Sequence, residues 1–184
     1  MSENNINIKI NAKENTQGVF GRVMGGLKSL GGAIAGYLSV SAITSFATSS
    51  VKEFINAEKA AEELAAAFRN SGEDAAKLMP QFKEFAAAIQ SVTKYEDDAI
   101  VSLMAFGRNL GIPTDKLKEA TKAAIGLAAR LRIDVNTAMQ LVGKAAQGNT
   151  SMLGRYGMKV KESMSDQKKF AAVLKMGISN FGLA

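Results

Sequence analysis

The chain contains no cysteine and no histidine among its 184 residues. These absences exclude disulfide frameworks, zinc sites built from cysteine or histidine, and serine–histidine or cysteine–histidine nucleophile pairs. They also exclude a histidine pH switch. A metal ion could be held only by carboxylates or carbonyls. The sequence therefore favours a non-enzymatic helical interaction protein, and we expect no cofactor.

Tryptophan is also absent, and there are only two prolines. Hydrophobic residues make up 47% of the chain, but many of them are alanines, so the nine phenylalanines must serve as the main large core residues. Seventeen glycines against two prolines are unusual for a helical protein. The glycines cluster early in the chain and later stand singly near predicted helix ends. The length allows one domain, or one domain with an extended arm.

The net charge is +6, and the excess is spread along the chain, with +2 in residues 1–50 and +4 in residues 51–184. Such an excess favours solubility and weak attraction to anionic partners. A DNA-facing surface remains an alternative to a solvated helix surface, although only Arg155 is followed by an aromatic residue, Tyr156. The basic residues concerned are Lys116, Lys118, Lys122, Arg130, Arg132, Lys144, Arg155, Lys159 and Lys161.

Residues 41–72 predict one long helix with a single apolar stripe. The stripe repeats at alternating steps of four and three, which is the spacing of a coiled coil. We therefore expect self-association through it. Its members are Ile43, Ala47, Phe54, Ala57, Ala61, Leu64 and Phe68, with Ser50 as a polar interruption.

Residues 1–40 indicate a flexible leader rich in glycine, alanine and serine. The alternation from Ile6 to Ile10 leaves open one short strand that pairs with a partner. Residues 29–51 form an uncharged run of 23 residues, long enough to cross a bilayer, but eight are serine or threonine. We favour packing against protein, and a membrane-active helical protein that inserts residues 29–51 remains the alternative.

Residues 73–184 predict a small bundle of short antiparallel helices, so the expected fold class is all-α with an extended helical arm. Three cap residues are predicted: Thr93 in a capping box with Glu96, Thr114, and Asp134. Pro80 is expected in the first turn of its helix. Further signals are glycine stops at Gly72, Gly111 and Gly148, one helical turn within residues 149–158, and a last helix that starts near Ser165 and Asp166.

Two motifs suggest ligand sites but have simpler explanations. Gly143 and Lys144 resemble part of a phosphate-binding loop, but Ala138 and Ala145 stand where that loop needs glycine and serine or threonine. The acidic run from Glu96 to Asp98 could bind a cation. Its position at a predicted helix start favours interaction with the helix dipole instead.

The segment from Leu141 to Gly148, followed by residues 153–158, resembles the N-terminal region of bacteriophage tail length tape measure proteins. The similarity extends more weakly over residues 33–177, in the order of helical segments. The motif residues are Gly143, Lys144, Gln147, Gly148, Leu153, Arg155, Tyr156 and Gly157.

The resemblance implies a structural role in the virion tail, with assembly in the host cytoplasm. Proteins of that family lie as homo-oligomers, here expected as a trimer, within the tail tube. They set tail length and leave ahead of the DNA. Expected partners are tail tube and tail tip proteins and tail assembly chaperones, with transient host membrane contact and non-specific DNA proximity.

The length of this chain limits the tail length that it could set. As one helix, 184 residues would span only about 280 Å, at ~1.5 Å per residue. We therefore expect that the bundle continues beyond residue 184 in a longer parent chain. A small tail-assembly adaptor is the other alternative.

Overall fold

The computed structural model describes residues 56–184, and these are helical with no β-strand. The chain divides into two compact units, residues 1–51 and 52–184, and the described residues belong to the second. The predicted all-α fold is confirmed for this part of the chain. The predicted leader, residues 1–40, lies outside the described residues, and so do residues 41–55 of the predicted long helix.

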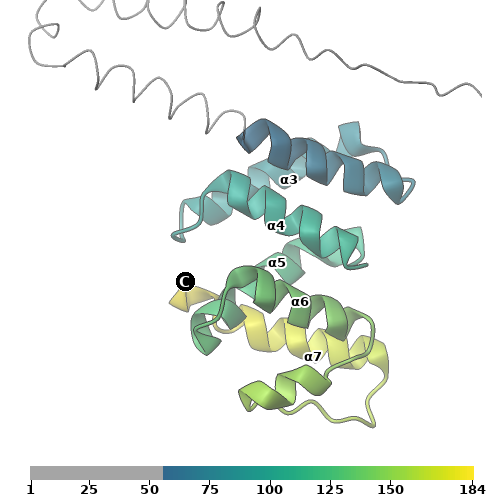
Figure 1. The fold of residues 1–184 in the computed structure, drawn as a ribbon, viewed down its shortest axis with the longest axis vertical. Helices are drawn as coiled ribbons and strands as arrows, with labels where there is room; N and C mark the ends of the chain where they lie inside the picture. Colours follow the sequence, from purple (N-terminus) through teal and green to yellow (C-terminus); the bar gives the residue numbers. More distant parts are fainter. Residues whose placement is uncertain (1–55) are drawn as a thin grey trace, which may run out of the picture. The chain divides into compact units, whose positions relative to one another are not determined.

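A helix over residues 56–70 is followed by a series of short helices joined by tight turns (Figure 1). They are α3 (Ala75–Gln90), α4 (Asp97–Asn109), α5 (Thr114–Leu131), α6 (Val135–Ala146), the 3-10 helix η1 (Ser151–Tyr156), α7 (Asp166–Ile178) and the 3-10 helix η2 (Phe181–Leu183).

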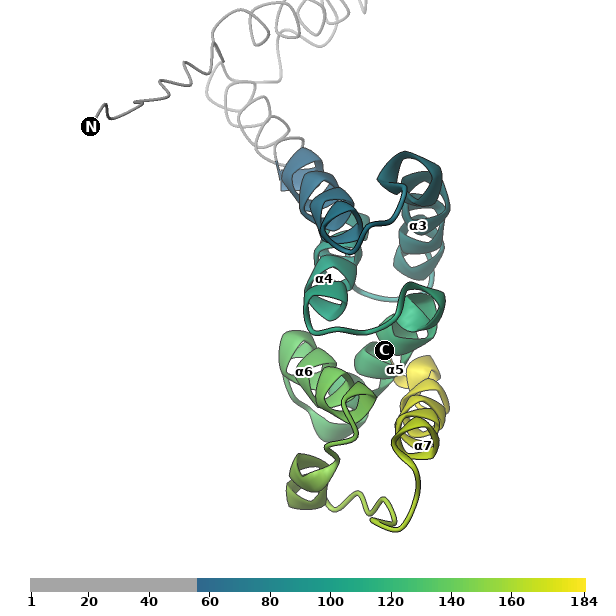
Figure 2. The same ribbon diagram turned by 90° about the vertical axis from the view of Figure 1, so that its right-hand side faces the viewer.

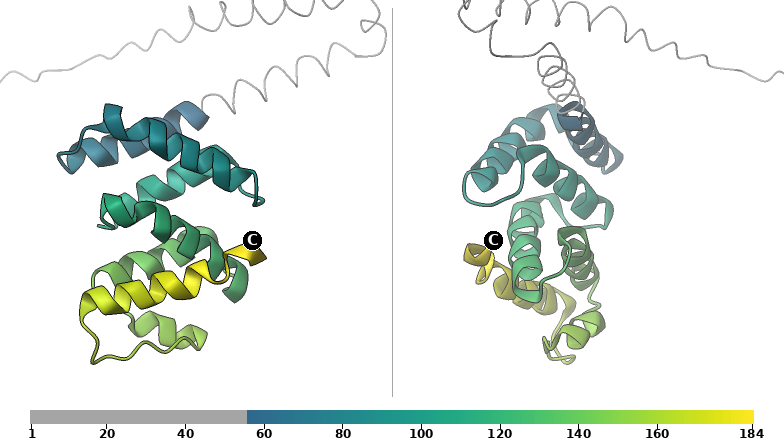
Figure 3. Two further views of the ribbon diagram at one scale, coloured as in Figure 1. Left: turned by 180° about the vertical axis from the view of Figure 1, so that it is seen from behind. Right: turned by 60° about the vertical axis from the view of Figure 1, so that its left-hand side comes forward.

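The helices of this unit are stacked in the order of the sequence. The helix 56–70 and α3 lie at one end, α4 and α5 follow, and α6, α7 and η1 form the other end (Figures 1 and 2). Helix α5 is central and contacts α4, α6, α7 and η2. The view from behind shows the same order (Figure 3). Residues 56–98 and residues 140–170 therefore occupy opposite ends of the unit.

Small residues let α5 and α7 approach closely. A Cβ atom on Gly126 would lie 2.1 Å from the carbonyl oxygen of Gly177, and a Cβ atom on Gly177 would lie 2.4 Å from that of Ala123. Neither position can hold a side chain without separating the two helices. The crossing buries Ala123, Ala124 and Ile125 fully. The alanine-rich core contains few large side chains, and the short distances between helix backbones compensate for their small volume.

The prediction that the apolar stripe mediates self-association is wrong for the last two large residues of the stripe. Leu64 and Phe68 are fully buried within this unit, and the Phe68 ring lies 5.0 Å from that of Phe82 on α3. Ala61 is half-buried and Ala57 is exposed. The stripe therefore packs against its own bundle here, because a marginal helix gains most by covering the nearest apolar face. Ile43, Ala47 and Phe54 lie outside the described residues, and their role in self-association stays a prediction.

The burial of Leu64 and Phe68 also changes the domain division. We expected a boundary between residues 72 and 73, but residues 52–184 form one unit. The helix 56–70 is part of that core rather than of a separate helical arm.

The helix ends agree in part with the predicted caps. The Asp134 carboxylate accepts hydrogen bonds from the backbone N–H groups of Asn136 and Thr137, as predicted, and Ser165 precedes α7. Thr93 does not cap α4: its hydroxyl donates to the Ile89 carbonyl and so closes the end of α3. Thr114 is the first residue of α5 rather than its cap, and Pro80 lies inside α3, beyond its first turn.

Candidate interaction surfaces

The residues of the 143–157 motif form one corner between α6, η1 and the start of α7. The Gln147 side chain donates a 3.0 Å hydrogen bond to the Leu110 carbonyl, and Gly143 packs against the Leu110 side chain. Gly148 has a φ of +82°, and a Cβ atom there would lie 2.3 Å from the Asp166 carboxyl carbon. Glycine at 148 therefore lets the chain turn while α7 starts beside it.

The remaining motif residues divide into one core residue and an exposed set. Leu153 is buried, whereas Lys144, Arg155 and Gly157 are exposed and Tyr156 is half-buried. Lys144 lies in the last turn of α6 rather than mid-helix as expected, with its ammonium against the Met152 sulfur. A phosphate-binding loop is not formed there, because the backbone N–H groups in the last turn of a helix are bonded within the helix and only those at its N-terminus are free.

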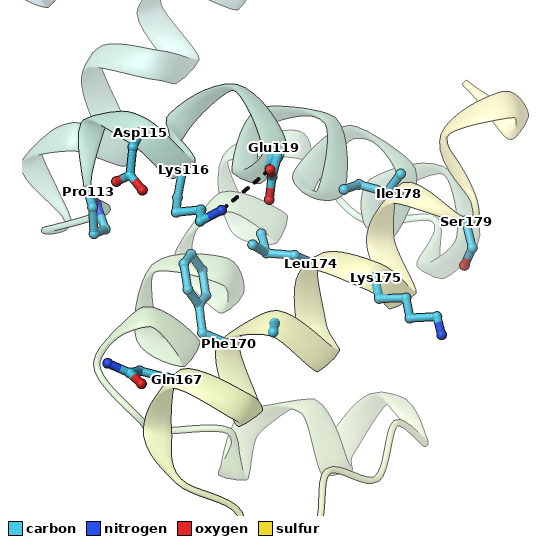
Figure 4. Close-up of a pocket in the computed structure, with 11 residues that line it drawn as sticks. Pro113, Asp115, Lys116, Glu119, Gln167, Phe170, Leu174, Lys175, Ile178 and Ser179 are labelled. Carbon is cyan, nitrogen blue, oxygen red and sulfur yellow. Dashed lines mark ion pairs between the residues drawn. The ribbon is translucent and has the colours of Figure 1, made fainter.

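One groove lies between the start of α5 and α7 and has a volume of about 730 Å³ (Figure 4). Phe170, Leu174 and Ile178 line it at helical spacing on α7. The rim on α5 carries the Lys116–Glu119 ion pair, 3.5 Å between Nζ and Oε1. A groove with an apolar floor and a charged rim can accept the apolar face of a helix. The residues that line this groove do not identify that helix.

A second groove, of about 450 Å³, lies between the helix 56–70 and α3. Its floor is made of small residues and one methionine, and its rim carries two glutamates and a lysine. The lining residues are Ala57, Ala61, Ala65, Met79, Glu58, Glu62 and Lys83. The groove is therefore apolar inside and mainly acidic at its edge.

Two lysines of α5 lie over phenylalanine rings, which the sequence did not predict. The Lys118 ammonium is 5.0 Å from the centre of the Phe82 ring, and the Lys122 ammonium lies within 6 Å of both Phe85 and Phe181. Only Arg155 and Tyr156 were expected to combine a cation with an aromatic residue. The spacing of both lysines on α5 and both phenylalanines on α3 was visible, but their pairing depends on how the two helices pack.

Charge is distributed unevenly between the two ends of the unit. Residues 56–98 hold five basic and nine acidic residues, a net charge of −4. Residues 140–170 hold six basic and two acidic residues, a net charge of +4. These segments occupy opposite ends of the unit (Figure 1). The excess that looked dispersed along the sequence is therefore a charge asymmetry in space. Sequence reasoning missed this because it summed the charge over residues 51–184.

The acidic run at the start of α4 acts as predicted for a helix end. Asp97 and Asp98 lie in the first turn of α4, where the helix dipole favours negative charge. No group of three or more acidic residues in the described part of the chain has the geometry to hold a metal ion. Nearby, burial and the charge of Asp134 raise the pKa of the Tyr95 hydroxyl.

Among residues 56–184, no helix is both long and apolar enough to cross a membrane. The uncharged run of residues 29–51 lies outside this range. Comparisons with protein-family models, with curated proteins and with solved structures find no match to the chain.

Proposed function

We propose that this chain is a structural protein of a phage tail, similar to the N-terminal region of tape measure proteins. The observation that carries the proposal is the 143–157 motif. The residues that resemble the family make one continuous corner, in which Gln147 binds the Leu110 carbonyl, Gly148 permits the turn and Leu153 enters the core. These positions define the local fold, so the resemblance falls on residues that matter to the structure.

In this role the 52–184 unit is a head domain, and the parent chain carries it into the growing tail. Its partners are further copies of itself, forming a trimer, together with tail tube and tail tip proteins and tail assembly chaperones. The grooves and charged ends described above are surfaces that such an assembly domain can use. The place of action is the virion tail, after assembly in the host cytoplasm.

The proposal is tested by changing the length of the parent polypeptide. An in-frame deletion of helical sequence outside residues 52–184 shortens the tail by about 1.5 Å for each residue removed. The measurement is tail length in electron micrographs of particles from the deleted and parental phage. As a matched control, replacing the same residues with an equal number of other helix-forming residues leaves tail length unchanged. Tails of parental length after the deletion would refute the ruler role.

A further inference from the structure

We propose that copies of the 52–184 unit associate head to tail, with the basic loop of one copy seated on the acidic groove of the next. The basic loop comprises residues 157–165, and the acidic groove is the one between the helix 56–70 and α3. The association is a property of this unit and does not require a tail tube, so it stands apart from the proposed tail function.

The basic loop presents its lysines outward. Lys159 and Lys161 are exposed, whereas Met158 is buried and Val160 packs against the core. Within the described residues neither lysine has an ion-pair partner, and the same is true of Arg155 and Lys168 beside them. The apolar residues anchor the loop, so Lys159 and Lys161 are held on its outer side. The exposed Glu162 beside them leaves the loop with a net charge of +1.

The acidic groove presents matching charges at a matching distance. Glu58 and Glu62 lie four residues apart on one helix, which places their Cβ atoms about 6 Å apart. Lys159 and Lys161 are two residues apart in a non-helical segment, so their Cα atoms are separated by at most about 7 Å. Glu58 has no ion pair among the described residues, whereas Glu62 also holds Arg69. The two pairs of charges can therefore face each other.

The groove also gives the contact an apolar component. Ala57, Ala61, Ala65 and Met79 leave a hollow of about 450 Å³ that an inserted loop can fill. Ion pairs at a protein surface give little affinity alone, so such a hollow matters for a stable contact. Because the two surfaces differ, the interface is heterologous, and it builds open chains or closed rings rather than symmetric dimers.

A second copy is favoured over a nucleic acid as the partner of the basic loop. The acidic groove lies on the same molecule, within the segment 56–98 of net charge −4, and the basic loop lies within the segment 140–170 of net charge +4. A polyanion would explain the basic loop but would leave the acidic groove without a role.

The test uses the full chain and charge reversal at both surfaces. We expect the wild-type chain to form larger species in low salt and to lose them in high salt, where the screening length falls from about 10 Å to about 3 Å. Lys159→Glu with Lys161→Glu should weaken association at least about tenfold, and Glu58→Lys with Glu62→Lys should do the same. The readout is the mass distribution from analytical ultracentrifugation at fixed protein concentration.

Two combinations of these variants make the test specific. The chain that carries all four substitutions keeps its net charge and should recover association, because a reversed loop then meets a reversed groove. An equimolar mixture of the two double variants should also recover association, in alternating order, because the intact loop of one variant meets the intact groove of the other and the reversed loop meets the reversed groove. Each double variant alone should stay dissociated. Circular dichroism confirms that each variant is folded.

The matched control reverses two other exposed cations. Arg130→Glu with Lys175→Glu changes the net charge equally but lies outside both surfaces, and it should leave association unchanged. Three outcomes would overturn the proposal: a wild-type chain whose mass does not depend on salt, a fourfold variant that stays dissociated, or a chain that binds double-stranded DNA through Lys159 and Lys161 while remaining monomeric.

Discussion

Glu73 joins three parts of the bundle at a single carboxylate. It follows the helix 56–70, accepts a 2.7 Å hydrogen bond from the Thr114 hydroxyl at the start of α5, and lies 3.4 Å from the Arg108 Nε atom in α4. Both side chains of the ion pair are largely buried, at 16% exposure for Arg108 and 30% for Glu73. Charged hydrogen bonds in such surroundings are worth more than exposed ion pairs.

We expect Glu73→Ala to lower the free energy of unfolding by about 1–3 kcal/mol, because Arg108 and Thr114 lose their shared acceptor. Urea denaturation monitored by circular dichroism measures the loss. Glu84→Ala is the matched control, because Glu84 is exposed on α3 and has no ion pair among the described residues. Equal stability of the two variants would show that the junction contributes nothing.

Tyr95 makes stability depend on pH at the alkaline end. Burial, and then the charge of Asp134, raise the pKa of its hydroxyl above the ordinary value of 10.0. The folded state therefore favours the neutral phenol. Its stabilising contribution is complete below pH 10.0 and is lost as the pH rises through the folded-state pKa. Tyr95→Phe should retain more stability than the wild type above that pH in urea titrations. Tyr156→Phe is the control, and identical profiles for both variants would contradict the assignment.

At the scale of helices, local signals in the sequence predicted the order and approximate bounds well. Asp134 caps α6 as expected, because an aspartate can bond the N–H groups two and three residues later without any help from tertiary structure. Thr93 and Thr114 failed as caps because other partners compete for their hydroxyls. Ile89 is within reach of Thr93, and Glu73 is brought to Thr114 by packing.

The surface against which an apolar stripe packs could not be predicted in the same way. Periodicity shows that Leu64 and Phe68 share a helix face, but not whether that face meets a second copy or the same chain. The structure buries both within the bundle. The candidate surfaces were missed for a related reason: the charge asymmetry and the lysine–phenylalanine contacts depend on which helices become neighbours.

The crossing of α5 and α7 is the element contact most sensitive to side-chain size. We expect Gly126→Ala to destabilise the bundle by about 1–3 kcal/mol, because the added methyl group would meet backbone atoms of α7 that cannot rotate away. Gly154→Ala is the matched control, since a Cβ atom there would meet nothing within 4 Å. Thermal unfolding of both variants gives the comparison, and an unchanged melting temperature for Gly126→Ala would refute the close crossing.

For the whole molecule, the features that carry the two proposals lie in one unit of the chain. The 143–157 corner, the acidic groove and the basic loop all belong to residues 52–184. The described residues form a stack of short helices, which does not extend with chain length as one long helix does. A ruler role therefore requires that further helical sequence accompany this unit.

The measurement that tests the tail role most directly is the intact mass of the native polypeptide that carries this sequence, taken from purified tails. The account predicts that peptides of residues 52–184 are found in the tail fraction, within a polypeptide several times larger than 19.5 kDa. A tail fraction without these peptides, or a native polypeptide of 19.5 kDa, would contradict a tape measure role.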